Sequence, residues 1–178
     1  MMRRFLDRLY AASGALAAVC VFLICALMLA QAFARGVGGQ IRGADDVISW
    51  LCAAAAFFAL GHTFRHGELV RVGLLVGRLQ GNARRLAELA ALVVTAILAG
   101  YTLWAVADYM LFAARAGYVT QGLIVIPEWV PQTSFLLGML IFLVAVLDEL
   151  VVVLRNRKPA YQRAEEERAA SGDFSETL

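Results

Sequence analysis

The chain has 178 residues, of which 61% are hydrophobic and 17% charged, and its formal net charge is +2. A soluble domain is typically about 45–50% apolar, so this composition argues against an ordinary soluble protein. The chain also lacks a basic run interleaved with aromatic residues, which argues against nucleic-acid binding. The apolar residues form four blocks, each long enough to cross a bilayer as a helix of about 20 residues.

The first apolar block covers about residues 9–34 and holds no charged residue between Arg8 and Arg35. It is longer than the core of a signal peptide, about 7–15 residues, which favours an uncleaved transmembrane helix. A face of small residues lets another helix approach closely. The partner is either the chain's own bundle or another protein. These small residues are Ala11, Ala12, Ser13, Gly14, Ala15, Ala17 and Ala18.

A glycine-rich turn precedes the second block, predicted as a helix over about residues 46–64. Asp45 and Asp46 suit its start, because helix N-termini carry partial positive charge. His62 and His66 are four residues apart and share a helix face, as half of a metal or haem site would. The further ligands of a zinc or haem site are missing from the sequence. We therefore expect no metal and no cofactor.

The stretch between the second and third blocks is too charged to span a bilayer and too apolar for a solvated loop. Its apolar residues share a helix face, so the pattern predicts an amphipathic segment over about residues 66–80 that lies at the membrane surface. Arg65, Arg71 and Arg78 would contact phospholipid headgroups or a protein partner. For Arg71 a role as a topology charge alone is an equal alternative.

The third block predicts a helix over about residues 86–112. Asp108 lies near its far end, close to Trp104 and Tyr109, which are typical of the membrane interface. A carboxylate at membrane depth is a candidate for an ion path. The position of Asp108 favours instead an ion pair with Arg115, or a contact with a partner.

An outer connection with the sequence I-P-E-W-V-P leads into the fourth block, predicted as a helix over about residues 132–154. Pro127 and Pro131 are expected to keep a helix from running through this connection. Glu128 and Trp129 lie between the prolines, and Trp129 is expected to anchor a rigid bend at the headgroups. Residues 155–178 are polar and predict a cytoplasmic tail.

Together these patterns predict one all-α integral membrane domain over residues 1–178, with four transmembrane helices and both termini in the cytoplasm. Basic residues favour the cytoplasmic side of short loops. The predicted outer side holds only Arg35, Arg42 and Arg115. The predicted inner side holds thirteen basic residues: Arg3, Arg4, Arg8, Arg65, Arg71, Arg78, Arg84, Arg85, Arg155, Arg157, Lys158, Arg163 and Arg168.

The chain resembles the small membrane subunits of tripartite ATP-independent periplasmic (TRAP) transporters. The resemblance rests on R-H-G-E-L-V-R-V-G-L-L at residues 65–75, and on I-P-E-W-V-P at residues 126–131 followed by a helix that contains Gly138. The four-helix layout and the length agree over nearly the whole chain. Leu69 and Gly73 depart from the His and Asp that the family often has there.

The resemblance implies a scaffold, not an enzyme, in the bacterial inner membrane. Its partners would be a large membrane subunit, which moves as an elevator in sodium-driven symport, and a periplasmic substrate-binding protein that delivers an organic acid. Glu128, Trp129 and Arg42 are the candidate residues for docking that binding protein. Two alternatives stay open: a haem or metal membrane protein that uses His62 and His66, and a stand-alone small transporter that uses Asp108.

Overall fold

The structure is a computed structural model that describes residues 2–66 and 82–155. The described part contains four helices: α1 (Met2–Gly36), α2 (Ala44–His66), α4 (Asn82–Ala116) and α5 (Trp129–Leu154). All four are long and apolar enough to cross a membrane. The predicted all-helical membrane fold is therefore confirmed at this level. The predicted surface segment at 66–80 and the tail at 155–178 lie almost wholly outside the described residues.

The helices extend beyond the apolar blocks that predicted them. Helices α1 and α4 each have 35 residues, which corresponds to a length of about 50 Å at 1.5 Å per residue. A hydrocarbon core is only about 30 Å thick. Both helices must therefore tilt in the bilayer or project beyond it.

Helix α5 begins at Trp129, before the predicted start near residue 132, and it includes Pro131 in its first turn. The first N–H groups of a helix have no acceptor within the helix, so a proline loses nothing at this position. Pro127 stays outside α5, and its carbonyl accepts a hydrogen bond from the Val130 N–H at 3.0 Å. Only the first of the two prolines therefore separates the loop from the helix.

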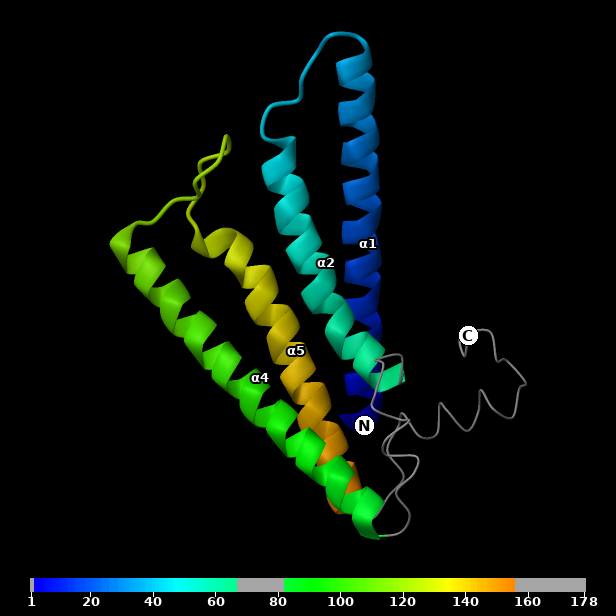
Figure 1. Cartoon of the computed structure of the whole chain (residues 1–178). Coiled ribbons are helices and arrows are strands. Elements are labelled where there is room, and N and C mark those ends of the chain that lie inside the picture. The colour runs from blue at the N-terminus through cyan, green and yellow to red at the C-terminus, as the bar shows by residue number, and fades with distance from the viewer. Residues whose placement is uncertain (1, 67–81, 156–178) are drawn as a thin grey trace, which may run out of the picture.

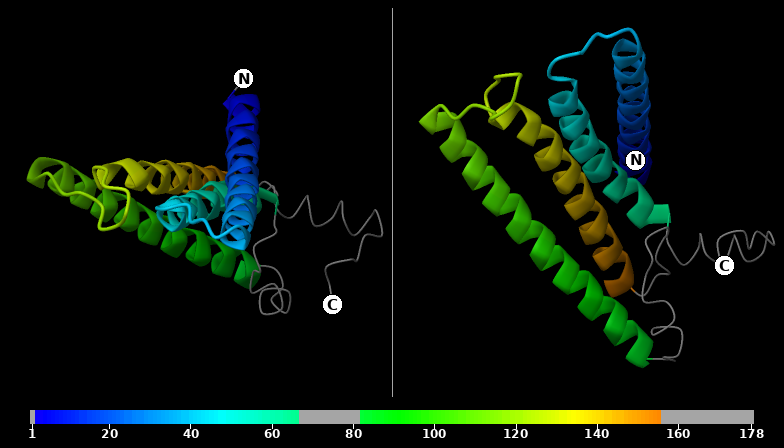
Figure 2. Two further views of the ribbon diagram at one scale, coloured as in Figure 1. Left: turned by 90° about the horizontal axis from the view of Figure 1, so that it is seen from above. Right: turned by 45° about the horizontal axis from the view of Figure 1, so that its top comes forward.

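The helices pack in the spatial order α1, α2, α5, α4, which differs from their order in the sequence. Helix α5 lies between α2 and α4 and is the most buried of the four, whereas α1 and α4 are largely exposed. The helices converge near the end of α5 and spread apart toward the other end (Figures 1 and 2). That spread end holds the turn at 37–43 and the loop at 117–128, and we call it the loop end.

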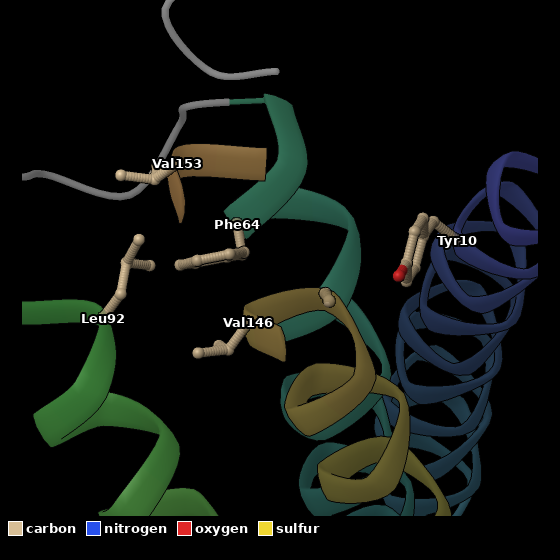
Figure 3. Close-up of a cluster of buried hydrophobic side chains, with 6 residues drawn as sticks. Tyr10, Phe64, Leu92, Val146 and Val153 are labelled. Carbon is tan, nitrogen blue, oxygen red and sulfur yellow. The ribbon is translucent and has the colours of Figure 1, made fainter. Parts of the chain in front are cut away.

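At the convergent end a small apolar cluster joins all four helices (Figure 3). Phe64 of α2 meets Phe142 of α5 edge to face, with ring centroids 5.5 Å apart. Such aromatic pairs add about 0.5–1.5 kcal/mol to the effect of burial alone. The buried members of the cluster are Tyr10, Phe64, Leu92, Ala145, Val146 and Val153.

Glycines allow the close approach of α2 to its two neighbours. A Cβ atom on Gly138 of α5 would lie 2.6 Å from the backbone carbonyl carbon of Phe57. A Cβ atom on Gly14 of α1 would lie 2.8 Å from Nδ1 of His62. Small residues at such crossings are the usual means by which membrane helices pack.

The small residues of α1 divide between two surfaces. Ser13 and Ala17 are buried, and Ser13 donates a hydrogen bond to the Phe58 carbonyl of α2. The remaining alanines at 11, 12, 15 and 18 are exposed. The chain's own packing therefore uses one part of this face, and another part stays on the surface.

Candidate functional site

The two helical hairpins meet at the loop end through the carboxylate of Asp46. Asp46 lies in the first turn of α2, and its Oδ2 accepts hydrogen bonds from the N–H groups of Leu123 at 2.8 Å and Ile124 at 3.1 Å. These amides belong to the loop between α4 and α5. The Asp46 carboxylate therefore lies at the positive end of its own helix dipole, and it also holds a loop 77 residues away in the sequence.

Two glycines make this contact close. Gly43 has φ +78°, a left-handed conformation that favours glycine, and a Cβ atom there would lie 2.5 Å from Cγ1 of Ile124. A Cβ atom on Gly122 would lie 2.5 Å from Oδ2 of Asp46. A larger residue at position 43 or 122 would therefore force the Ile124 or the Asp46 side chain, or the backbone that carries it, to shift. The sequence placed Gly43 in a flexible turn, but its contact with the distant loop was not predicted.

The loop at 117–128 is held by its own hydrogen bonds. The Thr120 N–H donates to the Ile126 carbonyl at 2.9 Å, and the Glu128 N–H donates to the Tyr118 carbonyl at 3.0 Å. The Thr120 hydroxyl also donates to the Ile124 carbonyl at 2.8 Å. These bonds fold the loop back on itself, so that Leu123 and Ile124 are presented to Asp46.

Two further polar contacts secure the loop end. Gln31 of α1 donates from Nε2 to Oδ1 of Asp45 at 3.0 Å, which ties the end of α1 to the start of α2. Tyr109 of α4 donates its hydroxyl to Oε1 of Glu128 at 3.1 Å, just before α5 begins. Both neighbouring aspartates are thus engaged, one toward α1 and the other toward the loop.

A cleft of about 610 Å³ opens beneath this network, between α2 and α4 and over α5. Trp50 and Phe135 contribute large apolar walls, and Ala53, Ala105 and Val106 line its deeper part. Asp46 and Glu128 line it at the loop end. Gln132 also lines it, and the Oε1 atom of Gln132 is buried with no hydrogen-bond partner among the described residues. The cleft is therefore mostly apolar, with two carboxylates at one end.

The predicted docking residues all lie at the loop end. Glu128 is partly buried and faces the cleft, whereas Trp129 is 41% exposed and Arg42 is exposed in the turn between α1 and α2. Asp108 and Arg115 are both exposed on α4. They are seven residues apart, a rise of about 10 Å along the helix. Their ion pair stays a prediction.

The residues predicted to contact the membrane surface or the large subunit lie mostly outside the part of the chain that the structure describes. Arg71 and Arg78 lie outside the described residues, and only the backbone of Arg65 is described, in the last turn of α2. His62 packs against Gly14, and its Nδ1 lies 3.3 Å from the Tyr10 carbonyl oxygen. The described residues place no three His, Cys, Asp or Glu side chains together as a metal site. The side chain of His66 is not among them.

The fold defines the class: four long apolar helices with extensive exposed apolar surface make this a multi-pass membrane protein. Residues 24–156 match the family model of the DctQ component of tripartite ATP-independent periplasmic transporters. The chain belongs to this DctQ family, the small membrane component of TRAP transporters. This is a family of transporter components, not of enzymes. Membership implies association with a large membrane subunit and a substrate-binding protein. A search of curated proteins finds no match to this chain.

Proposed function

We propose that this chain scaffolds the large elevator subunit of a TRAP transporter in the bacterial inner membrane, for sodium-driven uptake of an organic acid delivered by a binding protein. The match to the DctQ family over residues 24–156 carries the proposal. The apolar surfaces that α1 and α4 leave exposed support it, because they offer broad faces for a neighbouring membrane protein.

The row of helices suits a scaffold physically. Phe22 of α1 is 71% exposed and Trp104 of α4 is 65% exposed, at opposite ends of the row. Inside the row, α5 packs against α2 on one side and against α4 on the other. Such a layer widens whatever it packs against without needing chemistry of its own.

The basic stretch after α2 would secure this scaffold at the cytoplasmic surface. We propose that Arg65, Arg71 and Arg78 contact phospholipid headgroups or the large subunit there. Guanidinium groups bind phosphate and carboxylate groups bidentately, and the positive-inside pattern of the sequence places them on that side.

The loop end would face the periplasm and the binding protein. We propose Arg42 and Trp129 as docking residues, because both are exposed there. Glu128, the third predicted docking residue, faces the cleft at the same end. On α4, Asp108 and Arg115 would stabilise the same end as an ion pair or through a partner.

Co-purification tests the scaffold directly. An affinity tag on this chain, expressed from its natural gene neighbourhood, should retain a much larger multi-pass protein after mild detergent extraction. Deletion of the chain should abolish uptake. A tagged chain that purifies alone, in cells whose uptake survives its deletion, contradicts the scaffold role.

Docking has a separate kinetic signature. Arg42→Glu should lower uptake when the binding protein is limiting and leave uptake at saturating binding protein unchanged, because a rim charge acts mainly on association. Arg155→Glu, an exposed charge at the convergent end, is the matched control. Equal behaviour of the two variants removes Arg42 from the docking surface.

A further inference from the structure

We infer that the cleft between α2 and α4 receives the end of a transmembrane segment of the large subunit, with an arginine or lysine of that segment placed between Asp46 and Glu128. This inference rests on the proposed scaffold function and names the surface through which it acts. Its evidence is the charge, the unused hydrogen-bond capacity and the depth of the cleft.

The charge of the cleft is one-sided. Asp46 and Glu128 are its charged groups, and none of the described residues that line it is cationic. Asp46 accepts both loop amides on Oδ2, and Glu128 accepts Tyr109 on Oε1. Each carboxylate therefore retains an oxygen that bonds to no other described residue. A positively charged donor complements this end.

The side chain of Gln132 is independent evidence for a hydrogen-bond donor that a partner would supply. Its Oε1 is buried and bonds to none of the described residues. Leaving a buried acceptor without a partner costs about 1–3 kcal/mol. Gln132 is four residues beyond Glu128, so the two lie on the same face of the chain as it enters α5. An arginine or lysine brings several N–H donors and would serve both groups.

The depth of the cleft indicates which kind of partner segment would fill it. Ala53 lies seven residues beyond Asp46 on α2, and Phe135 lies seven residues beyond Glu128, so the apolar part extends roughly 10 Å from the charged end. Both residues lie within spans that are apolar enough to cross a membrane. The occupant thus needs about two turns of apolar surface followed by a cation, which is the pattern at the end of a transmembrane helix.

This pattern disfavours the other occupants. A soluble binding protein would have to insert apolar side chains to membrane depth. A phospholipid with an ammonium headgroup also carries a phosphate, and the described lining offers that phosphate no cation. A volume of about 610 Å³ is large for a single ion.

Photo-crosslinking in the intact transporter tests the inference. A benzophenone amino acid is placed at Ala53 or Ala105, on opposite walls of the cleft, in native membranes that contain all subunits. We expect an adduct with the large subunit from both positions. An adduct only with phospholipid, with the binding protein or with a second copy of this chain overturns the inference. So does the lack of any adduct in a complex that still co-purifies.

Charge variants test the cation. Glu128→Gln should weaken retention of the large subunit roughly tenfold or more during purification, because a charge pair removed from water loses one partner. Glu128→Lys should abolish the adduct from Ala105. Tyr109→Phe is the matched control, because it removes the hydroxyl bonded to Glu128 and keeps both carboxylates. If Glu128→Lys retains the adduct, the occupant is not cationic.

Co-purification and crosslinking separate the scaffold function from the contact at the cleft. If the large subunit does not co-purify with the unmodified chain, the proposed function fails. If it co-purifies but the cleft positions give no adduct with it, the scaffold stands and the cleft is not its contact.

Discussion

At the scale of single residues, Asp46 decides how the two hairpins meet. Its carboxylate binds two backbone amides of a distant loop, and Gly43 and Gly122 leave the space for that contact. The donors are main-chain N–H groups, which every residue type except proline supplies. The sequence therefore predicted an acidic residue at the start of a helix. No residue type in the distant loop marked the backbone amides that this residue would bind.

Replacing Asp46 by alanine should release the loop at 117–128. The loss of two partly exposed hydrogen bonds to a charged acceptor should cost on the order of 1–3 kcal/mol of local stability. Hydrogen exchange at the Leu123 and Ile124 amides should become faster in Asp46→Ala, and less so in Asp46→Asn, which keeps an acceptor. Ser49→Ala is the control, because the Ser49 hydroxyl donates within α2, to the Asp45 carbonyl. Unchanged exchange in Asp46→Ala contradicts this role.

At the scale of helices, the crossing of α2 and α5 depends on Gly138. The nearest atoms to an added Cβ are the backbone of Phe57, which cannot rotate away as a long side chain can. Phe135, one turn earlier on α5, also contacts the Phe57 ring, with centroids 3.9 Å apart. The central pair of the row is thus fitted closely along more than one turn.

Gly138→Ala should therefore destabilise the protein by about 1–3 kcal/mol, the usual cost of overpacking a close contact. Gly100→Ala on α4 is the matched control, because no described residue outside its own stretch of helix comes within 4 Å of its Cβ position. Alanine also favours a helix over glycine by up to about 1 kcal/mol, so the control should be neutral or stabilising. Thermal unfolding in detergent measures both variants, and equal melting temperatures would contradict the observed crossing.

The four helices themselves were predictable, because each apolar block exceeds the length needed to cross a bilayer. Which helices pack against one another could not be predicted. Exposed and buried positions in such helices are both mostly apolar, so hydropathy does not mark the contact faces. The small residues of α1 were predicted as a packing face, and Gly138 was named only as part of a family motif. Nothing in the sequence showed that α5 packs between α2 and α4. The cleft was missed for the same reason, since residues of α2, α4, the loop at 117–128 and α5 line it together.

At the scale of the whole molecule, topology is the first property to establish. The distribution of basic residues predicts both termini inside and the loop end outside. The structure brings the turn at 37–43 and the loop at 117–128 to the same end, as this topology requires. The side of the membrane that each end faces stays a prediction.

Labelling of introduced cysteines tests the topology. In a variant that lacks Cys20, Cys25 and Cys52, a membrane-impermeant maleimide should label a cysteine placed at Val37 or Leu123 in intact spheroplasts. Both positions are highly exposed, at 86% and 72%. A cysteine at Arg155 should react only after the membrane is opened. The reverse pattern would place the loop end in the cytoplasm and exclude docking of a periplasmic protein there.

The central claim is that this chain works only as part of a larger transporter. Reconstitution into proteoliposomes tests it most directly, with the large subunit, the binding protein and a sodium gradient, in the presence or absence of this chain. We expect organic-acid uptake from the complete set, loss of uptake when this chain is omitted, and no uptake by this chain alone. Full uptake without it, or transport by the isolated chain, would contradict the account.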